Sequence, residues 1–307
     1  MTPHRRPALP TVLAMAATAA LVLTGCATTA TTEAVEAADQ PRNEVALEAD
    51  DEIAALVPSE VRDTGTLLIG TSPPYPPNQY TDASGELIGF DIDVMTAVTQ
   101  LMGLQAEFEP TDFDAILPAV EGNQLDTAAS SVTVNDERLE TVDFVTYFEA
   151  GVQWTSAAGT IIDPDEACGL SVAVKRATLS DSRELPARSE ACAAAGRPAI
   201  ETVRFDSQDD ATAAVALGQV DAMSADSPVA AFSVRQSQGK LQLAGDVEDA
   251  APYGWPVRQD SDLAAALEAA AAKLIDTGVL ETIAQHWGVE GGLIDAPETR
   301  KGDTDDG

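Results

Sequence analysis

The chain has 307 residues, enough to bury a large core and more than one typical domain needs, so two lobes are the natural expectation. Its 51 Asp and Glu residues against 17 Lys and Arg residues give a net charge of −34. This acidic balance argues against nucleic acid or an anionic membrane surface as a partner, because both are bound through clustered cations.

The N-terminus has the composition of an export signal rather than of a folded domain. Basic residues at 4–6 precede a short Ala, Leu and Val run at 11–23, which is too short for a comfortable membrane span. The run ends in Leu23-Thr24-Gly25-Cys26, which resembles the lipobox of bacterial lipoproteins. By this resemblance residues 1–25 are a signal peptide and Cys26 carries a lipid at the outer face of the cell membrane. The alternative is a cysteine that happens to follow a signal peptide.

Residues 26–60 are rich in Thr, Ala and Glu with little hydrophobic periodicity, so we expect a disordered tether there. The first lobe is expected over residues 61–150. Strands are predicted at 66–70, 126–129 and 142–148, with a short strand within 85–90. Helices are predicted at about 91–102 and 112–121. This alternation predicts a parallel, doubly wound α/β lobe.

A second lobe of similar make is expected over residues 151–248. Its predicted strands are 170–174, 200–205, 220–223 and 241–244, with helices that begin near Thr178 and Ser207. Residues 249–290 are expected to return to the first lobe as two helices, and residues 291–307 to form a flexible tail. The chain thus leaves the first lobe near 149–154 and returns near 246–255, and two crossings predict a hinge with a cleft between the lobes.

Two cysteines remain beyond Cys26, and they lie 24 residues apart. Cys168 and Cys192 in an exported chain are disulfide candidates. A zinc site is not expected, because His286 is the one histidine left after removal of a signal peptide. We predict no metal and no other cofactor.

Polar residues gather directly after the strand predicted at 126–129. Ser130, Ser131 and Thr133 follow it, and Asn135 is placed to cap the turn that carries Arg138. Hydroxyls and a guanidinium at the carboxyl end of a strand predict a site for a small carboxylate. From this stretch alone a second interpretation stays open, in which the hydroxyls serve the turn and Arg138 is a solvated surface residue.

Short motifs recur in a fixed order over residues 61–290. They are Ile69-Gly-Thr with Tyr75-Pro-Pro77, Gly85-Glu-Leu-Ile-Gly-Phe-Asp-Ile-Asp93, Phe113-Asp-Ala-Ile-Leu-Pro-Ala119, Ser130-Ser-Val-Thr133 with Glu137-Arg138, Val142-Asp-Phe144, Val172-Ala-Val174 with Thr178, Gly218-Gln-Val-Asp-Ala222 with Asp226, and His286-Trp-Gly288. Together they resemble the polar amino-acid-binding proteins of ABC importers, the bacterial extracellular solute-binding proteins of family 3. The pair Cys168 and Cys192 is similar to a disulfide of actinobacterial members.

The resemblance implies two α/β lobes of the type II periplasmic-binding-protein kind, joined by a two-crossing hinge. It also implies a lipid-anchored, monomeric receptor that carries an amino acid or similar small zwitterion to the permease subunits of an ABC importer.

Eight positions match the family's ligand contacts. Arg138 would clamp the ligand carboxylate, and Asp226 would accept from the α-ammonium group. The other matching positions are the donors Ser130, Ser131, Thr133 and Thr178 and the walls Tyr75 and Phe113. For Asp226 a helix N-cap before Ser227-Pro228 is an alternative that can coexist with binding.

The chain also departs from the family's pattern. It has Ser72 where binders of basic amino acids carry an acid, Asn78 where many relatives carry an aromatic residue, and Lys175-Arg-Ala177 in place of Gln-x-Gly. Ser72 and Asn78 disfavour a cationic ligand side chain, and a Lys or Arg in the cleft favours an acidic one. Whether Lys175 and Arg176 face the cleft stays open.

Two other functions remain open on the same scaffold. One is an enzyme similar to the cyclohexadienyl and arogenate dehydratases, with a carboxyl group as general acid. The other is a ligand sensor without transport. Arg138 and Asp226 at the amino-acid-clamp positions favour binding over catalysis.

Overall fold

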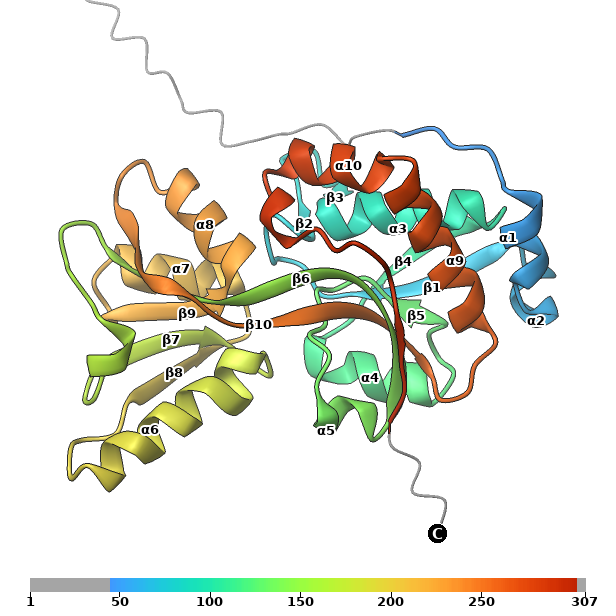
Figure 1. Cartoon of the computed structure of the whole chain (residues 1–307). Helices are drawn as coiled ribbons and strands as arrows, with labels where there is room; N and C mark the ends of the chain where they lie inside the picture. Colours follow the sequence, from blue (N-terminus) through green and yellow to red (C-terminus); the bar gives the residue numbers. More distant parts are fainter. Residues whose placement is uncertain (1–44, 303–307) are drawn as a thin grey trace, which may run out of the picture. The chain divides into compact units, whose positions relative to one another are not determined.

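The computed structural model describes residues 45–302. The predicted signal peptide, the lipid site Cys26, and residues 26–44 of the predicted tether lie outside the described residues, as do residues 303–307. Within the described range the chain forms two α/β lobes joined by two long strands (Figure 1). The predicted fold class and the two-crossing hinge are therefore confirmed.

A three-stranded parallel sheet forms the centre of the first lobe. Its order is β4 (Gln105–Pro110), β1 (Thr66–Thr71) and β5 (Thr127–Ala128). Along β1 the side chains alternate, so that Leu67 and Ile69 join the core on one face and Leu68 joins the cluster on the other. The first face carries α3 (Phe90–Leu101), α9 (Leu263–Asp276) and α10 (Val279–Trp287), and the second carries α4 (Phe113–Glu121) (Figure 1).

Strand β4 was missing from the sequence-based expectation. Only Ala106 and Phe108 pack against the core, while Glu107 and Glu109 alternate with them toward solvent. Such an edge strand is short and half polar, so its hydrophobic signal is weak. A small hairpin of β2 (Tyr80–Thr81) and β3 (Leu87–Ile88) completes this part of the lobe.

Strands β6 (Val142–Ala157) and β10 (Leu241–Arg258) run antiparallel and form both crossings between the lobes. The pairing shifts register between Ala244 and Glu248, between Glu248 and Ala251, and between Tyr253 and Gly254. These bulges lie where the chain passes from one lobe to the other, and bulges bend a strand and increase its twist. The segment 142–148 therefore belongs to this antiparallel pair, and its placement in a parallel sheet was wrong.

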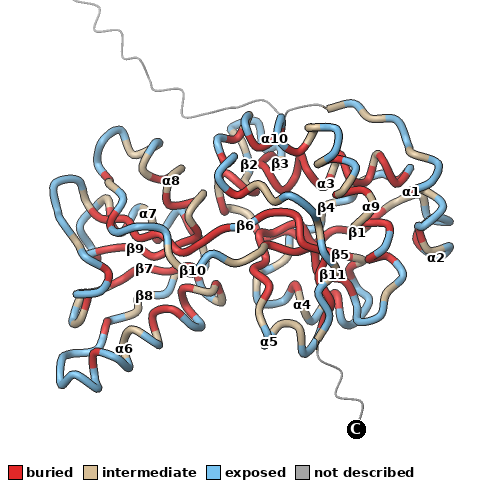
Figure 2. Tube along the Cα trace, viewed as in Figure 1, coloured by how far each residue is buried: buried red, intermediate tan, exposed pale blue. Residues whose placement is uncertain are grey.

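The second lobe extends the same sheet in the order β10, β6, β9 (Ala222–Asp226), β7 (Ser171–Lys175) and β8 (Glu201–Phe205). Its parallel part, β9-β7-β8, is covered on both faces by helices. The connecting elements are η1 (Pro164–Glu166), the π-helical turn η2 (Ser180–Glu184), α6 (Leu185–Ala194), α7 (Gln208–Ala216) and α8 (Ser227–Gln236). Buried residues concentrate on the strands and on the helix faces turned toward them (Figure 2).

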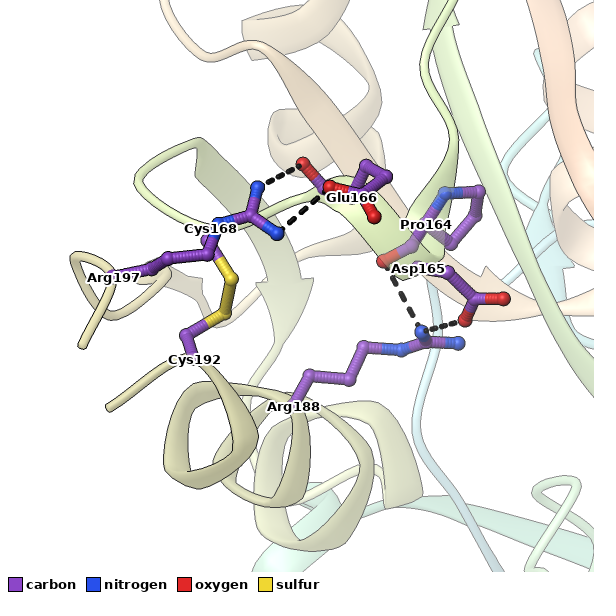
Figure 3. The surroundings of a disulfide bond; sticks show 7 residues. All are labelled: Pro164, Asp165, Glu166, Cys168, Arg188, Cys192 and Arg197. Atoms are coloured by element: carbon purple, nitrogen blue, oxygen red, sulfur yellow. Dashed lines mark hydrogen bonds and ion pairs between the residues drawn. A yellow bond between two sulfur atoms is a disulfide. The ribbon is translucent and has the colours of Figure 1, made fainter. Parts of the chain in front are cut away.

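The disulfide predicted between Cys168 and Cys192 is confirmed. It joins the turn before β7 to α6, with 5.6 Å between the two Cα atoms. Ion pairs flank it, because Arg197 bonds Glu166 at 2.7 Å and Arg188 bonds Asp165 at 3.0 Å (Figure 3). These contacts tie α6 to the loop that precedes β7.

The predicted tether extends too far, because residues 45–60 are folded. They form α1 (Asp51–Leu56) and the start of α2 (Ser59–Arg62), and Asp50 caps α1 by accepting from the N–H groups of residues 52 and 53. Ile53, Val57 and Val61 are buried in the core of the first lobe. The helical pattern here is short and is interrupted by the extended Val57 and by Pro58, so it gives only a weak signal in the sequence.

The tail expectation is also wrong for residues 291–302. After the turn η3 (Glu290–Gly292), strand β11 (Thr299–Arg300) pairs antiparallel with β6. Thr146 donates its N–H to the carbonyl oxygen of Glu298 at 2.9 Å, and its hydroxyl accepts from the Glu298 N–H at 2.9 Å. A free strand edge thus holds a segment whose Gly, Asp and Pro content suggested no structure.

Candidate functional site

A cavity lies between the lobes and is lined by residues from both. Its lining residues are Tyr75, Gln79, Phe113, Ser130, Ser131, Thr133, Arg138, Lys175, Thr178, Leu179 and Asp226. All eight residues singled out in the sequence lie on this wall. Gln79, Lys175 and Leu179 were not among them.

Arg138 lies on the short helix α5 (Asp136–Leu139), whose N-cap Asn135 accepts from the Arg138 N–H at 2.9 Å. Its Nη1 donates to the carbonyl oxygen of Thr133 at 2.7 Å, and its Nη2 donates to that of Ala177, in the other lobe, at 3.2 Å. The guanidinium carbon lies 5.5 Å from the centre of the Phe113 ring. No carboxylate within residues 45–302 forms an ion pair with Arg138. Burial lowers the pKa of this guanidinium, which still stays ionised. The Arg138 guanidinium is therefore held in one orientation, and its positive charge is not neutralised by a described carboxylate.

The two serines of the site have different hydrogen-bond partners. Ser131 has a left-handed backbone with φ +52°, and it donates its N–H and its hydroxyl to Asp91 Oδ2 at 2.6 and 2.9 Å. Ser130 Oγ instead accepts from the Ser72 N–H and from Gln79 Nε2, both at 3.1 Å. Because no described residue accepts from the Ser130 hydroxyl, its proton is available to a group in the cavity.

Asp91 and the residues around it support the serines and were not found in the sequence. Asp91 is fully buried at the start of α3, and its Oδ1 accepts from the Tyr147 hydroxyl at 2.7 Å. Burial raises the pKa of Asp91 to about 6, against the effect of its hydrogen-bond donors. Asn78 Nδ2 adds a bond of 2.8 Å to Ser131 Oγ. The signal in the sequence that could have identified Asp91 is an aspartate among the apolar residues at the start of a helix.

Asp226 ends β9 and faces the cavity. Its Oδ2 accepts from the Tyr253 hydroxyl at 2.6 Å, and the residue is 7% exposed. Burial raises the pKa of Asp226, while Tyr253, Tyr75 and Arg138 act to lower it. The residue stands at the N-cap position of α8, yet its side chain makes no capping hydrogen bond. The capping alternative for this side chain is therefore wrong.

Thr178 lies on the cavity wall, but it does not cap the helix that was expected to begin near it. Its hydroxyl donates to the carbonyl oxygen of Lys175 at 2.8 Å, and Leu179 takes the N-cap position of η2. Ala177 next to it has φ +62°, a left-handed conformation that normally favours glycine. Its N–H donates to Asp181 at 3.0 Å, and this bond helps to hold the turn.

Tyr75 and Phe113 both line the cavity. The Tyr75 hydroxyl is buried and makes no hydrogen bond of ordinary geometry with the described residues, although Asp226 is close. Burial, with the negative charge of Asp226, raises the pKa of this hydroxyl well above its usual value. A buried hydroxyl at a cavity wall without a protein partner is suited to a polar ligand atom.

Lys175 faces the cavity, which answers the question left open by the sequence. It is the last residue of β7 and is 4% exposed, and burial lowers its pKa to about 8. Arg176 turns the other way and pairs with Asp206 at 2.8 Å on the surface. Since Val172 and Val174 face the core around Leu185, the alternation of a strand directs Lys175 to the opposite side.

Among residues 45–302 no cluster of three or more His, Cys, Asp or Glu side chains is arranged to hold a metal ion. The same range contains no helix with the length and apolar character needed to cross a membrane.

Comparison with known proteins places this architecture in a family. Residues 67–290 match the bacterial extracellular solute-binding proteins, family 3. The arginine-binding protein ArgT of Corynebacterium glutamicum is 42% identical over 246 residues, which cover 80% of this chain and 81% of that protein. The structure of an ancestral arginine-binding protein bound to arginine is 31% identical with a TM-score of 0.66, over 73% of this chain and 98% of the other. An ancestral arginine-binding protein bound to glutamine is 30% identical with a TM-score of 0.66, over 74% and 99%. The chain therefore belongs to family 3 of the extracellular solute-binding proteins, as its motifs indicated.

Proposed function

We propose that this family 3 solute-binding protein is a lipid-anchored, extracytoplasmic receptor for a polar amino acid or similar small zwitterion, which it delivers to the permease of an ABC importer. One observation carries the proposal: Arg138 and Asp226 bring opposite charges from different lobes to one cavity. A zwitterion has the matching pair of charges.

The geometry suggests how each end of the ligand is bound. The carboxylate accepts from Arg138 and from the free hydroxyl proton of Ser130, while the α-ammonium donates to Asp226. The Tyr75 hydroxyl supplies one more polar contact. Because Arg138 and Asp226 come from different lobes, one ligand satisfies both only when the cleft is closed, and this differential affinity shifts the protein toward the closed state.

The relatives support an amino acid as the ligand. They include an arginine-binding protein and ancestral arginine-binding proteins with arginine and with glutamine bound. These ligands share the α-carboxylate and α-ammonium groups that the proposal assigns to Arg138 and Asp226. They differ in the side chain, so the ligand class is inferred from the α-carboxylate and α-ammonium groups.

Attachment through Cys26 completes the proposal, together with a monomeric state and capture outside the cytoplasm. The lipobox-like sequence at residues 23–26 supports the anchor. Labelling with a radioactive fatty acid in the producing cell tests it, and Cys26→Ser should abolish both the label and membrane retention. A labelled Cys26→Ser variant would contradict this part alone.

A thermal-shift screen with the twenty common L-amino acids tests the receptor function. A ligand at about 100 times its dissociation constant adds roughly 2.7 kcal/mol to the free energy of unfolding. We expect one or a few polar amino acids to raise the melting temperature. A flat screen, or loss of water from prephenate or arogenate catalysed by the protein, would favour the dehydratase alternative instead.

A further inference from the structure

Lys175 crosses the cleft and anchors on the other lobe. It belongs to β7 of the second lobe, while its Nζ donates to the carbonyl oxygen of Ser72 at 3.0 Å and to Ser72 Oγ at 3.3 Å in the first lobe. The residue as a whole is 4% exposed, so Lys175 is almost fully withdrawn from water. The two hydrogen bonds to Ser72 therefore hold the Lys175 ammonium group in place in the cavity.

The ammonium group of Lys175 also lies against the two aromatic walls. Its Nζ is 5.1 Å from the centre of the Tyr75 ring and 5.7 Å from that of Phe113. Aromatic faces attract cations at such distances. A cationic ligand side chain directed at the same rings would meet the positive charges of Lys175 and Arg138, since the Arg138 guanidinium lies over Phe113 as well.

The charges of the cavity wall do not balance. Arg138 and Lys175 are its cations, and Asp226 is its one carboxylate. No carboxylate within the described residues lies within 4.0 Å of the Lys175 ammonium, although Asp226, Asp209 and Asp112 act on it from farther away. The carboxylate and ammonium of an amino acid would neutralise Arg138 and Asp226 and leave Lys175 without an anionic partner.

We propose that Lys175 selects the ligand, and that the cavity prefers an amino acid whose side chain ends in an oxygen acceptor, a carboxylate or a carboxamide, over one with a cationic side chain. The proposal rests on the receptor function stated above and goes further by naming the class of side chain. The Lys175 ammonium, directed by Ser72, donates to that oxygen, while Tyr75 and Phe113 enclose the carbon chain.

Isothermal titration of the purified protein with L-glutamate, L-glutamine, L-arginine and L-lysine tests the proposal. We expect glutamate or glutamine to bind at least ~10-fold more tightly than arginine and lysine, because a hydrogen bond to a charged group is worth roughly 10- to 100-fold in affinity. In Lys175→Met, which replaces the apolar part of the side chain with one of similar length and removes the ammonium group, this preference should fall by a similar factor. Arg176→Met is the matched control, because Arg176 is the neighbouring cation, pairs with Asp206 on the surface, and should change nothing.

Tighter binding of arginine or lysine to the unaltered protein would overturn the proposal and leave the receptor function intact. Unchanged glutamate and glutamine affinities in a folded Lys175→Met variant would overturn it too. If none of the twenty common amino acids binds, the receptor function fails and the inference with it. The order of affinities for the four amino acids, measured on the unaltered protein, tests the proposal even if the Lys175→Met variant does not fold.

Discussion

The hydroxyl of Tyr253 donates a 2.6 Å hydrogen bond to the carboxylate of Asp226. Tyr253 belongs to the crossing strand β10 and also bridges to Thr133, close to Arg138, whereas Asp226 belongs to the second lobe. The crossing strand therefore orients the acid that the proposed ligand would bind, and couples it to the loop that carries the proposed carboxylate clamp.

Removal of this donor should make amino-acid binding more sensitive to acid. Burial already raises the pKa of Asp226, and Tyr253→Phe removes a group that lowers it. Because only the ionised carboxylate attracts an ammonium group, binding should weaken as pH falls, and the loss should begin at a higher pH in the variant. Titrations between roughly pH 4 and pH 7 measure the shift. Superimposable pH profiles would show that the bond does not tune Asp226.

Arg138→Met should abolish amino-acid binding. It leaves the ligand carboxylate buried without its charged partner, at a cost of about 3–5 kcal/mol, equivalent to roughly a few hundred- to several thousand-fold in affinity. Calorimetry with the amino acids that bind the unaltered protein measures the loss. Arg183→Met is the control, because Arg183 is an exposed cation outside the cavity lining and should leave affinity unchanged. Retained affinity in Arg138→Met would mean that the clamp lies elsewhere.

Asp91 should make the protein less stable as pH rises from 4 to 7. Its pKa is about 6 in the folded state against 3.8 ordinarily, so the folded state binds the proton more tightly. Its stabilising contribution is present below the lower value and is lost as pH rises through the higher one, a change of about 3 kcal/mol. Asp91→Asn cannot titrate at this position. The unfolding free energy of the unaltered protein minus that of the variant, both measured with urea, should therefore fall by that amount as pH rises. A difference that is constant with pH would contradict the shift.

Reduction of the disulfide should destabilise the second lobe. Cys168 and Cys192 close a loop with a sequence separation of 24, and release of a loop of this size costs about 3–4 kcal/mol on the chain-entropy model. Urea unfolding with and without a reducing agent measures the loss. The double variant Cys168→Ser and Cys192→Ser should be as unstable as the reduced protein and insensitive to the agent. Mass spectrometry of non-reduced peptides that found both thiols free would contradict the bond.

Two substitutions in α1 test whether residues 45–60 belong to the first lobe. Ile53 is 5% exposed in its core, so Ile53→Ala should cost about 2–5 kcal/mol of unfolding free energy. Leu56, on the same helix, is 45% exposed, and Leu56→Ala should change stability by less than about 0.5 kcal/mol. Equally small changes in unfolding free energy for the two variants would indicate that residues 45–60 are a tether and not part of the first lobe.

Much of the architecture was determined by local patterns in the sequence. Periodic apolar residues marked α3, α4, α9 and α10, and alternating or continuous apolar runs marked β1, β7 and β8. The same logic failed at β4, whose signal is half polar, and at residues 45–60 and 291–302. These segments are ordered by surfaces that other parts of the chain provide, and a local pattern carries little information about such surfaces.

The site divides in the same way. The resemblance of the ordered motifs to the family identified eight of the eleven residues that line the cavity. Only the tertiary structure decided that Lys175 faces the cavity while Arg176 faces solvent, that Asp226 bonds Tyr253 instead of capping α8, and that Asp91 holds Ser131. These pairs are separated by between 27 and 103 positions in the chain. Contacts at such separations depend on how strands and lobes meet, and the residues themselves carry no local mark of them.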